Sequence, residues 1–352
     1  MGSHHHIHQR NPHPLLQEAA FFQEHQYTPA PLLVQWMVWS GCPLSCPHCL
    51  VGEPQHDDFA SDPKARTRFL DQIASWPDTE LLLTGGEPVA HPTFPSTIGE
   101  LRERNIRWSL NSAIWPNDAA RASIRQHPPR FVAISLDGPE ELHDNFRGKT
   151  GSFREAVSAI EWYSTICTEV AAGTTVTHQN VNLLPSLLPT IMSTRATEWG
   201  LHTVFAQGRA KAHPELTLSE EEKEAMLTFA TRARRIFPIN LGDEIGYLGH
   251  REPLLRDTPF FCGAGRTQLV VSPSGDVLPC TTTDPEHVEG NCLQTPLADL
   301  WRDGFQSLRR KRSLKGCRRC TYHEACGGGC CLQSLSAENC ARPRRFGGLR
   351  RP

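Results

Sequence analysis

Residues 32–49 read LLVQWMVWSGCPLSCPHC, an apolar run that passes directly into a cluster of three cysteines. The apolar part, 32–39, carries no charge and stops at Ser-Gly, which is typical of a short buried strand. The cysteines follow with the spacing C-x3-C-x2-C, at Cys42, Cys46 and Cys49. Three thiolates at this spacing can bind three irons of one [4Fe–4S] cluster, for which four cysteines are the usual set. One iron would then stay open to a bound molecule, so these cysteines are candidate catalytic residues as well as metal ligands.

Zinc is the alternative metal for these three cysteines. A structural zinc site normally has four ligands, and His48 or His56 would provide the fourth beside the cysteines. A redox pair formed by two of the cysteines is a third interpretation. The spacing alone leaves all three open.

Strand-like apolar runs alternate with helical patterns over the first two thirds of the chain. The expected strands cover 32–39, 80–84, 106–111, 131–136, 170–177 and 201–206. The expected helices cover 61–76, 93–104, 117–126, 151–166, 183–199 and 219–236. This alternation predicts an α/β fold with a parallel sheet and outer helices. Six β–α units are fewer than the eight of a closed TIM barrel, so the pattern allows an open partial barrel or a doubly wound sheet.

The pattern changes after about residue 250. Segments 267–272 and 277–280, joined by Pro-Ser-Gly-Asp, predict a β-hairpin, and 296–309 predicts a helix. The stretch 316–340 holds too much Gly and Cys for an ordinary apolar core, so we expect an inorganic centre to organise it. We therefore expect an N-terminal extension that partly resembles an expression tag, an α/β domain and a small cysteine-rich domain, at 1–30, 31–240 and 241–352.

The composition bears on the cellular compartment and on the classes of binding partner. The 352-residue chain has 13 cysteines and a formal net charge of −2. An odd number of cysteines without an export signal is more typical of metal binding in a reducing cytosol than of disulfides, so we expect a cytoplasmic protein. No apolar run approaches the ~20 residues of a membrane span, and the charge gives no general case for binding nucleic acid or a membrane.

A second motif, Gly85-Gly86-Glu87-Pro88, follows the expected second strand. With C-x3-C-x2-C after the first strand, it resembles the pair of motifs that marks the radical S-adenosylmethionine (SAM) superfamily. The resemblance implies a partial (β/α)6 TIM-like barrel, which agrees with the count of six units. It also implies that the amino and carboxylate groups of SAM chelate the open iron of a [4Fe–4S] cluster.

The same resemblance implies a set of SAM-binding residues. The segment from Gly85 to Pro88 would hold the methionine amino group through its glycine backbone and Glu87. Ser135 and Arg147 are candidates for the ribose and the carboxylate of SAM, since a cation beside a carboxylate is favourable. A simple turn is the alternative for the glycine-containing motifs. The remaining candidates lie after the first strand or at the ends of the third, fourth and sixth strands: His48, which would pack on adenine or stay exposed, and Asn111, Ser112, Asp137, Gly208 and Arg209.

The C-terminal cysteines form a second pattern, which resembles the SPASM domain, an extension of radical SAM enzymes that carries auxiliary iron–sulfur clusters. Its seven cysteines are ordered as Cys262, Gly275-x4-Cys280 and Cys317-x2-Cys320-x5-Cys326-x3-Cys330-x9-Cys340. The resemblance implies that auxiliary cluster II is held by Cys317, Cys320, Cys326 and Cys340, and auxiliary cluster I by Cys262, Cys280 and Cys330. A zinc ribbon is the alternative for the set assigned to cluster II.

Auxiliary cluster I would lack one cysteine, because two fully thiolate-bound clusters need eight and the motif supplies seven. Asp257, Cys292 and Cys331 are the candidates for the fourth ligand. We hypothesise that this cluster is incompletely ligated and that its open iron binds substrate or an exchangeable ligand. Cys167 lies outside every motif and is expected to be a small buried apolar residue.

The expected activity is reductive cleavage of SAM to a 5′-deoxyadenosyl radical, which removes hydrogen from a C–H bond. Family members of this architecture mostly modify peptides or proteins, so we expect a peptide or protein substrate. The alternatives are radical tailoring of a small molecule, such as an amino sugar or a tetrapyrrole, and anaerobic sulfatase maturation. Sulfatase-maturing enzymes carry Asp directly after the hairpin cysteine, where this chain has Thr281, and the difference argues against that role. A non-enzymatic iron–sulfur or zinc protein is the alternative from another class, but such a protein needs no SAM-binding motif.

The expected partners are an electron donor and a substrate. Flavodoxin, ferredoxin or a reductase would deliver the electron, and the Arg-rich runs 309–312 and 318–319 would dock an acidic donor or peptide. Most such runs are solvated surface, and no recognised nucleic-acid module accompanies them. No peptide-recognition domain is visible before residue 32, so any leader peptide is expected to bind elsewhere. Nothing in the sequence indicates the oligomeric state.

Overall fold

The computed structural model of the chain describes residues 24–51, 58–281, 285–309, 322, 326 and 328–330. Its centre is a ten-stranded sheet with the order β10-β9-β8-β1-β2-β3-β4-β5-β6-β7. The strands of this described part are β1 (Leu33–Met37), β2 (Glu80–Thr84), β3 (Arg107–Ser112), β4 (Phe131–Ser135), β5 (Glu169–Val176), β6 (Glu198–Thr203), β7 (Ile239–Leu241), β8 (Gln268–Val271), β9 (Asp276–Leu278) and β10 (Gly290–Asn291).

Strands β1 to β7 lie in chain order, and each pairs in parallel with the next. A doubly wound sheet reverses its strand order at a switch point, so this arrangement decides for the partial barrel. Strand β8 pairs in parallel with the other side of β1, and β9 and β10 follow in antiparallel pairing. The expected hairpin therefore extends the barrel sheet itself, and β7 and β10 form its two edges.

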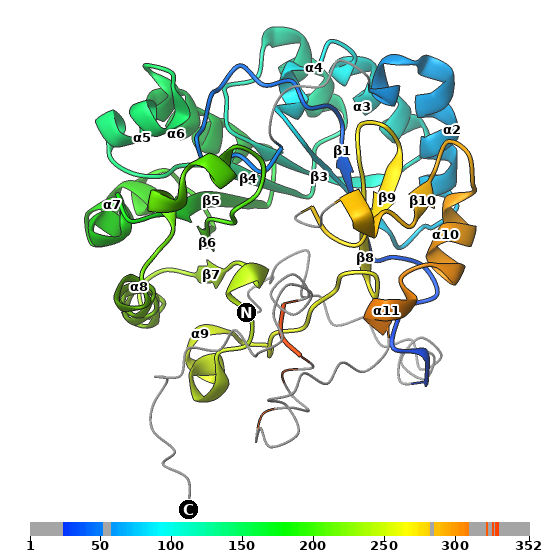
Figure 1. Ribbon diagram of the computed structural model, residues 1–352. Helices are drawn as coiled ribbons and strands as arrows, with labels where there is room; N and C mark the ends of the chain where they lie inside the picture. The colour runs from blue at the N-terminus through cyan, green and yellow to red at the C-terminus, as the bar shows by residue number, and fades with distance from the viewer. Residues whose placement is uncertain are drawn as a thin grey trace, which may run out of the picture.

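Helices form an arc around the outer side of the curved sheet (Figure 1). They are α2 (Pro63–Ala74), α3 (Phe94–Glu103), α4 (Asp118–Gln126), α5 (Glu140–Arg147), α6 (Ser152–Tyr163), α7 (Leu184–Ser193) and α8 (Glu220–Ala233). Shorter helices follow in the C-terminal third: α9 (Glu252–Leu255), α10 (Leu297–Asp303) and α11 (Gln306–Arg309). Among the described residues, no helix combines the length and the apolar character that crossing a membrane requires.

Alternate strand positions separate an apolar outer face from a polar inner face. On β1, Trp36 is fully buried, and its ring lies 5.3 Å from that of Phe59 and 5.0 Å from that of Phe69 in α2. The neighbouring Gln35 points the other way and donates to the side chain of Gln268 on β8 at 3.4 Å. The inner side of the sheet, where the strands curve toward one another, can therefore hold polar groups.

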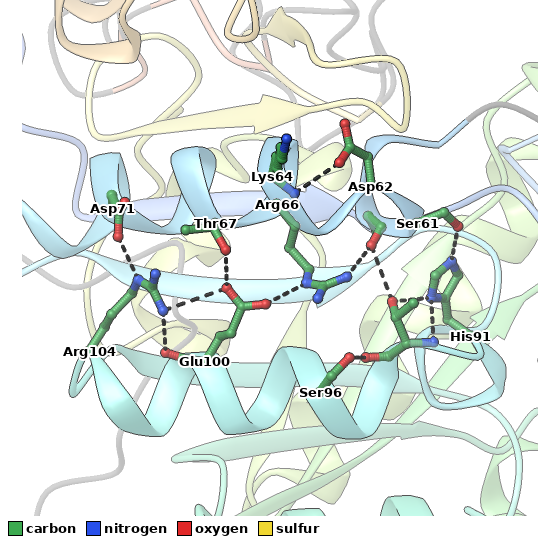
Figure 2. A network of polar contacts seen from close by, with 12 residues as sticks. Ser61, Asp62, Lys64, Arg66, Thr67, Asp71, His91, Ser96, Glu100 and Arg104 are labelled. Atoms are coloured by element: carbon green, nitrogen blue, oxygen red, sulfur yellow. Dashed lines mark hydrogen bonds and ion pairs between the residues drawn. The ribbon is translucent and has the colours of Figure 1, made fainter.

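A polar network joins α2 to α3 and holds the 3-10 turn Phe59–Ser61, which precedes α2 (Figure 2). Glu100 accepts hydrogen bonds from Arg66 Nε at 2.7 Å and from Thr67 Oγ1 at 2.8 Å. The Nδ1 atom of buried His91 accepts from a backbone N–H at 3.2 Å, so its proton is on Nε2. That Nε2 lies 3.2 Å from Asp58 Oδ1 and donates to it. Asp58 caps the 3-10 turn Phe59–Ser61, so this bond ties the turn to the segment that follows β2.

The sixth β–α unit begins earlier than expected. The helix expected over 183–199 ends at Ser193 as α7, because Arg195 adopts a positive φ of 63° and interrupts the helical path. Trp199 therefore belongs to β6, where its indole N–H donates to Thr174 Oγ1 at 2.8 Å and its ring contacts Phe229 of α8. Strand β7 was not predicted, since three residues are too few for a period-two pattern to stand out. Helix α5 was not predicted either.

The helix expected over 296–309 is divided into α10 and α11, with Phe305 at a φ of 59° between them. Beyond the break, the Arg309 guanidinium lies over the Tyr27 ring at 3.6 Å and donates to Gly265 O at 2.9 Å. Arg309 is buried, so its assignment to an exposed basic run was wrong: aromatic packing and carbonyl acceptors hold it inside. The other members of that run, 310–312 and 318–319, lie outside the described residues.

Helix α8 begins with a capping box. Ser219 Oγ accepts from Glu222 N at 3.2 Å, and Glu222 Oε2 accepts from Ser219 N at 2.8 Å. Replacing Ser219 with Ala should lower the free energy of unfolding by ~1 kcal/mol, because a helix N-terminal N–H loses its acceptor. Urea unfolding measures the change. Ser164→Ala, which removes an exposed hydrogen bond to Glu161 O after α6, is the control and should shift stability by less than ~0.5 kcal/mol; equal losses in the two variants would contradict the role of the cap.

Candidate functional site

The three cysteines of the first motif lie on one loop that follows β1. Cys46 is buried, whereas Cys42 and Cys49 are half-buried. Within the loop, Leu44 N donates to Cys42 Sγ at 3.4 Å, and Cys49 N donates to Cys46 O at 3.3 Å. These local bonds fold the motif into a compact turn at the end of the strand. We call residues 40–50 the cysteine loop.

The GGEP segment holds the start of the cysteine loop. Glu87 N donates to Gly41 O at 2.9 Å, and Gly86 N donates to Trp39 O at 2.7 Å. A Cβ atom at Gly86 would overlap the Gly41 carbonyl, so a residue without a side chain is needed for the two backbones to approach this closely. In return, Trp39 Nε1 donates to Glu87 O at 2.8 Å. The simple-turn alternative does not account for these contacts between two strand ends.

Two further segments hold the rest of the cysteine loop. At the end of α5, Arg147 O accepts from Ser45 N at 3.1 Å. After β6, Arg209 donates twice, from its backbone N to Cys49 O at 2.9 Å and from Nε to Cys46 O at 3.0 Å. The loop is therefore fixed by hydrogen bonds to segments that follow β2, β4 and β6.

A buried ion pair lies behind the cysteine loop. Both Nε and Nη2 of Arg147 lie 2.6 Å from Asp137 Oδ2, and the two side chains are 7% and 0% exposed. Arg147 Nη1 also donates to Cys46 Sγ at 3.6 Å, and Thr175 N donates to Asp137 Oδ1 at 3.0 Å. Burial alone would raise the pKa of Asp137, but the Arg147 cation outweighs it and holds that pKa below its ordinary value. The site therefore keeps a fixed positive charge beside one cysteine sulfur.

Two histidines beside this pair are neutral. Burial lowers the pKa of His143 to about 4 and that of His48 to about 3. His143 Nδ1 accepts from Asp137 N at 3.0 Å, so its 3.5 Å approach to the carboxylate of Asp137 is a contact without charge pairing. The His48 ring stacks on Phe146, with centroids 4.3 Å apart and an interplanar angle of 6°. His48 is thus a flat neutral ring held within the motif, rather than a freely exposed one.

The carboxylate of Glu87 is turned into the protein. It is buried, and its oxygens accept from Ser112 Oγ at 2.8 Å and from Ala113 N at 2.7 Å. Burial raises the pKa of Glu87 to about 7, although these donors oppose the rise. Glu87 and Ser112 therefore join the end of β2 to the end of β3. A direct bond from either side chain to SAM stays a prediction.

The other predicted SAM contacts lie along the same ends of the strands. Asn111 is exposed on β3, and Ser135 is half-buried at the end of β4. Pro88 opens the short 3-10 turn after the GGEP glycines. A Cβ atom at Gly208, which has a φ of 55°, would collide with the carbonyl of Cys49, so this glycine allows the segment after β6 to reach the cysteine loop. The contacts of these residues with SAM stay predictions, as do those of Gly85, Asp137, Arg147 and Arg209.

The thiols of the cysteine loop suit an iron–sulfur cluster in which each cysteine binds a different iron. Burial raises the pKa of Cys42 to about 11 and that of Cys46 above its ordinary value, although Arg147 opposes the rise at Cys46. Thiol ligands lose these protons when metal binds. Among the residues that the structure describes, no three or more His, Cys, Asp or Glu side chains gather around the position of a single metal ion. Cysteines that bind different irons of one cubane need not meet at one point, so the loop fits such a cluster.

The C-terminal motif is described in part. Cys262 precedes the β8–β9 hairpin and Cys280 follows it, and the antiparallel pairing of Val270 with Leu278 places Cys280 at its open end. Cys330 is buried, and Cys326 is half-buried. Cys317, Cys320 and Cys340 lie outside the described residues, so the ligand sets of the two auxiliary clusters stay predictions.

Two candidates for the fourth ligand of auxiliary cluster I have other roles. Cys292 is 4% exposed within the apolar core, and burial raises its pKa to about 12. Asp257 forms an ion pair with Arg234. Cys331 lies outside the described residues. The incomplete ligation of cluster I stays a prediction. Cys167 packs against the core as a half-buried thiol.

Several residues that hold the site carry no motif signal. Phe146 is the residue before Arg147, and its aromatic ring is the only cue to the stacking on His48. Thr175 acts through its backbone N–H, which no residue-type pattern predicts. His202 faces the inside of the sheet, and the alternation that marks it becomes visible only once β6 is known to begin at Glu198.

Two family profiles match this chain. Residues 36–182 match the radical SAM superfamily, and residues 262–321 match SPASM, an iron–sulfur cluster-binding domain. The match over the second region disfavours the zinc-ribbon alternative. Together the two domains imply SAM, a [4Fe–4S] cluster and auxiliary clusters as cofactors.

Curated relatives extend over most of the chain. An AdoMet-dependent heme synthase of Nitratidesulfovibrio vulgaris is 25% identical over 329 residues, which cover 86% of this chain and 88% of that protein. The mycofactocin maturase MftC of Mycobacterium tuberculosis is 26% identical over 315 residues, which cover 86% of this chain and 78% of the maturase.

Solved structures share the architecture. Streptococcus suis SuiB bound to S-adenosylmethionine superposes with a TM-score of 0.70 at 15% identity, covering 92% of this chain and 78% of SuiB. The enzyme anSMEcpe with bound AdoMet gives a TM-score of 0.66 at 18% identity, covering 85% of this chain and 88% of that one. These likenesses confirm the predicted fold class, a partial barrel followed by a SPASM region.

The buried ion pair makes a prediction about stability. Replacing Arg147 with Ala should lower the free energy of unfolding by ~3–5 kcal/mol, because the Asp137 carboxylate is left buried without its partner. Urea unfolding of the protein before cluster reconstitution measures this loss. Arg154→Ala is the matched control, since its ion pair with Glu140 is largely exposed and should contribute less than ~1 kcal/mol. Equal stability of the Arg147 variant and the wild type would mean that Arg147 serves only a ligand.

Proposed function

We propose that this chain, which is a radical SAM enzyme with a C-terminal SPASM domain, modifies a peptide or protein by removing hydrogen from one of its C–H bonds. The observation that carries the proposal is the cysteine loop, which hydrogen bonds from three neighbouring segments hold at the ends of the strands. When bound there, the [4Fe–4S] cluster supplies the electron that cleaves SAM to a 5′-deoxyadenosyl radical. The auxiliary clusters belong to the same proposal, with the SPASM cysteines as their ligands.

The residues of the chain have separate tasks in this proposal. Cys42, Cys46 and Cys49 hold the SAM-cleaving cluster, and Arg147 keeps a positive charge beside Cys46. A fixed cation next to a thiolate favours the negative charge that a reduced cluster gains. The backbone of the GGEP segment is the proposed contact for the methionine amino group, while the buried Glu87 side chain orients that backbone through its bonds to β3.

The domain division at 31–240 and 241–352 is part of the proposal. The two family matches lie within these boundaries. Because β8 pairs with β1, the SPASM region is bonded to the same strand that leads into the cysteine loop.

Two observations support a peptide substrate. One matched relative is a maturase of mycofactocin, and SuiB has been solved with its precursor peptide SuiA, in a structure that superposes with a TM-score of 0.69. The exposed Asn111 on β3, which alternates with the core residues Trp108 and Leu110, gives the inner side of the barrel an amide group that suits an amide-rich ligand. Sulfatase maturation is disfavoured by Thr281, which follows Cys280 where the maturing enzymes carry Asp.

A tetrapyrrole is the second candidate substrate, because a relative covered to 88% of its length is a heme synthase. The further elements of the proposal are a flavodoxin, ferredoxin or reductase as electron donor and a reaction in the cytoplasm. The reducing conditions of the cytoplasm support both the electron donor and this location, since thiol ligands and low-potential clusters persist there.

The first test concerns cluster content and SAM cleavage. Anaerobic reconstitution should give about 10–12 irons per chain if three clusters form, depending on the occupancy of each. Replacing Cys42, Cys46 and Cys49 together with Ala should abolish 5′-deoxyadenosine formation with dithionite while the auxiliary iron remains. Cys167→Ala is the matched control and should keep both the iron and the activity. Stoichiometric zinc without iron in the wild type would contradict the proposal.

The second test concerns the substrate class. Short peptides encoded beside the gene should stimulate 5′-deoxyadenosine formation and change mass by the loss of hydrogen or a defined fragment. Fe-coproporphyrin III is the comparison substrate in the same assay, followed by absorbance and mass spectrometry. If the enzyme converts Fe-coproporphyrin III but no peptide, a tetrapyrrole replaces a peptide as the proposed substrate.

A further inference from the structure

Strands β5 and β6 present a patch without bulky side chains on the inner side of the sheet. Gly173 and Gly200 are paired neighbours there, and Ser135 of β4 pairs with Gly173. A Cβ atom added to Gly173 would meet nothing closer than the Ile134 carbonyl oxygen at 3.8 Å. We call Ser135, Gly173 and Gly200 the glycine patch. It leaves space for part of a ligand beside the strand ends that carry the cysteine loop.

His202 stands beside the glycine patch. It lies two residues after Gly200 and therefore faces the same side of the strand, while Trp199 and Leu201 pack into the outer core. Its Nε2 is 3.1 Å from the position that a Gly200 Cβ would take, so the ring leans over the patch. The His202 side chain is 48% exposed although β6 is flanked by β5 and β7. An exposed ring at this place faces the inner side of the barrel.

Glu244 lies beside the other ring nitrogen of His202. The Nδ1 atom lies 3.7 Å from Glu244 Oε1, and the same oxygen accepts from Thr203 N at 2.6 Å. Glu244 belongs to the 3-10 turn after β7, and its side chain is only 11% exposed. A carboxylate fixed behind one nitrogen of an imidazole leaves the other nitrogen to exchange protons, and such contacts often shorten when a ligand binds.

The surrounding charges favour proton uptake by His202. Desolvation by the surrounding protein would lower the pKa of His202, but Glu244, and then Asp243 and Asp137, raise it above the ordinary value. Glu244 remains a carboxylate, because His202 and the Thr203 N–H outweigh its burial and lower its pKa. Glu198, below Gly200 on the same face of β6, has a pKa raised by burial to about 7.

We propose that His202, oriented by Glu244, is a catalytic residue that accepts the proton lost by a substrate lying over the glycine patch. The inference rests on the proposed function and adds the base to it. The substrate loses one hydrogen as an atom to the SAM-derived radical, and a second as a proton and an electron. The proton moves to Nε2 of His202, which becomes an imidazolium beside Glu244. The electron passes to an iron–sulfur cluster as acceptor, the product gains one bond, and His202 later releases its proton to water.

The first arm of the test needs no substrate. Diethyl pyrocarbonate, which reacts with neutral imidazole, is applied to the reconstituted full-length enzyme between about pH 5 and pH 9, and mass spectrometry follows each histidine. The midpoint for His202 should lie above the ordinary 6.5 in the wild type and move to lower pH in Glu244→Gln, because the carboxylate no longer stabilises the imidazolium. A midpoint at or below 6.5 in the wild type, or one that Glu244→Gln leaves in place, overturns the proposal.

The second arm uses the substrate found by the assay of peptides and Fe-coproporphyrin III. His202→Asn should lower the product formed per 5′-deoxyadenosine by about 100-fold, the usual scale of general base catalysis. The ratio in the wild type should rise with pH through the midpoint of His202, and Glu244→Gln should shift this rise to lower pH. His178→Asn removes a histidine whose exposed side chain pairs with Glu222 of α8, and the product formed per 5′-deoxyadenosine should equal that of the wild type. A His202 variant that matches this control overturns the proposal; absence of turnover with every substrate would count against the proposed function alone, and the titration would still decide on His202.

Discussion

A carboxylate and a guanidinium with almost no access to water, those of Asp137 and Arg147, meet behind the cysteine loop at 2.6 Å. Removing either charge alone would leave the other stranded in the protein, so the pair has to be kept or lost as a unit. Each partner also holds a different part of the site. Arg147 reaches Cys46 with its side chain and Ser45 with its carbonyl, and Asp137 is bonded to β5 through Thr175 N. Residues after β1 and β4 are thereby tied to β5 at one point.

The rest of the site divides between the two halves of the barrel. Around β1 to β3, backbone bonds and the buried carboxylate of Glu87 fix the cysteine loop and the GGEP segment with little room between them. Around β4 to β6, glycines replace side chains on the inner face, and polar groups such as His202 stay exposed. The strand ends around β1 to β3 thus suit a cofactor, which Arg147 and Arg209 also help to enclose by their bonds to the cysteine loop, and the exposed groups around β4 to β6 suit a substrate. The SPASM region is joined to the first of these sides, since β8 is the neighbour of β1.

Sequence patterns predict the helices and strands that depend on residues close together in the chain. The parallel sheet followed from alternating runs, and the positions of the two motifs at strand ends followed from where those runs stop. Strand β6 begins earlier than predicted because a positive φ at Arg195 ends α7. Such a backbone conformation is not visible in the hydrophobic pattern of the sequence. Arg309 resembled a surface charge because a run of basic residues does not reveal that Tyr27, far away in the chain, covers one of them. The roles of Glu87 and His202 depend on contacts between different strands, so they required the assembled sheet.

Low-temperature electron paramagnetic resonance of the dithionite-reduced protein, recorded with and without SAM, tests the central claim most directly. Direct binding of SAM to the open iron of the Cys42, Cys46 and Cys49 cluster should change the g-values of one of the cluster signals and leave the others in place. The same change should be absent from the variant that lacks these three cysteines. A set of signals that SAM leaves unaltered in the fully reconstituted wild type would contradict the assignment of the cysteine loop as the SAM-cleaving centre.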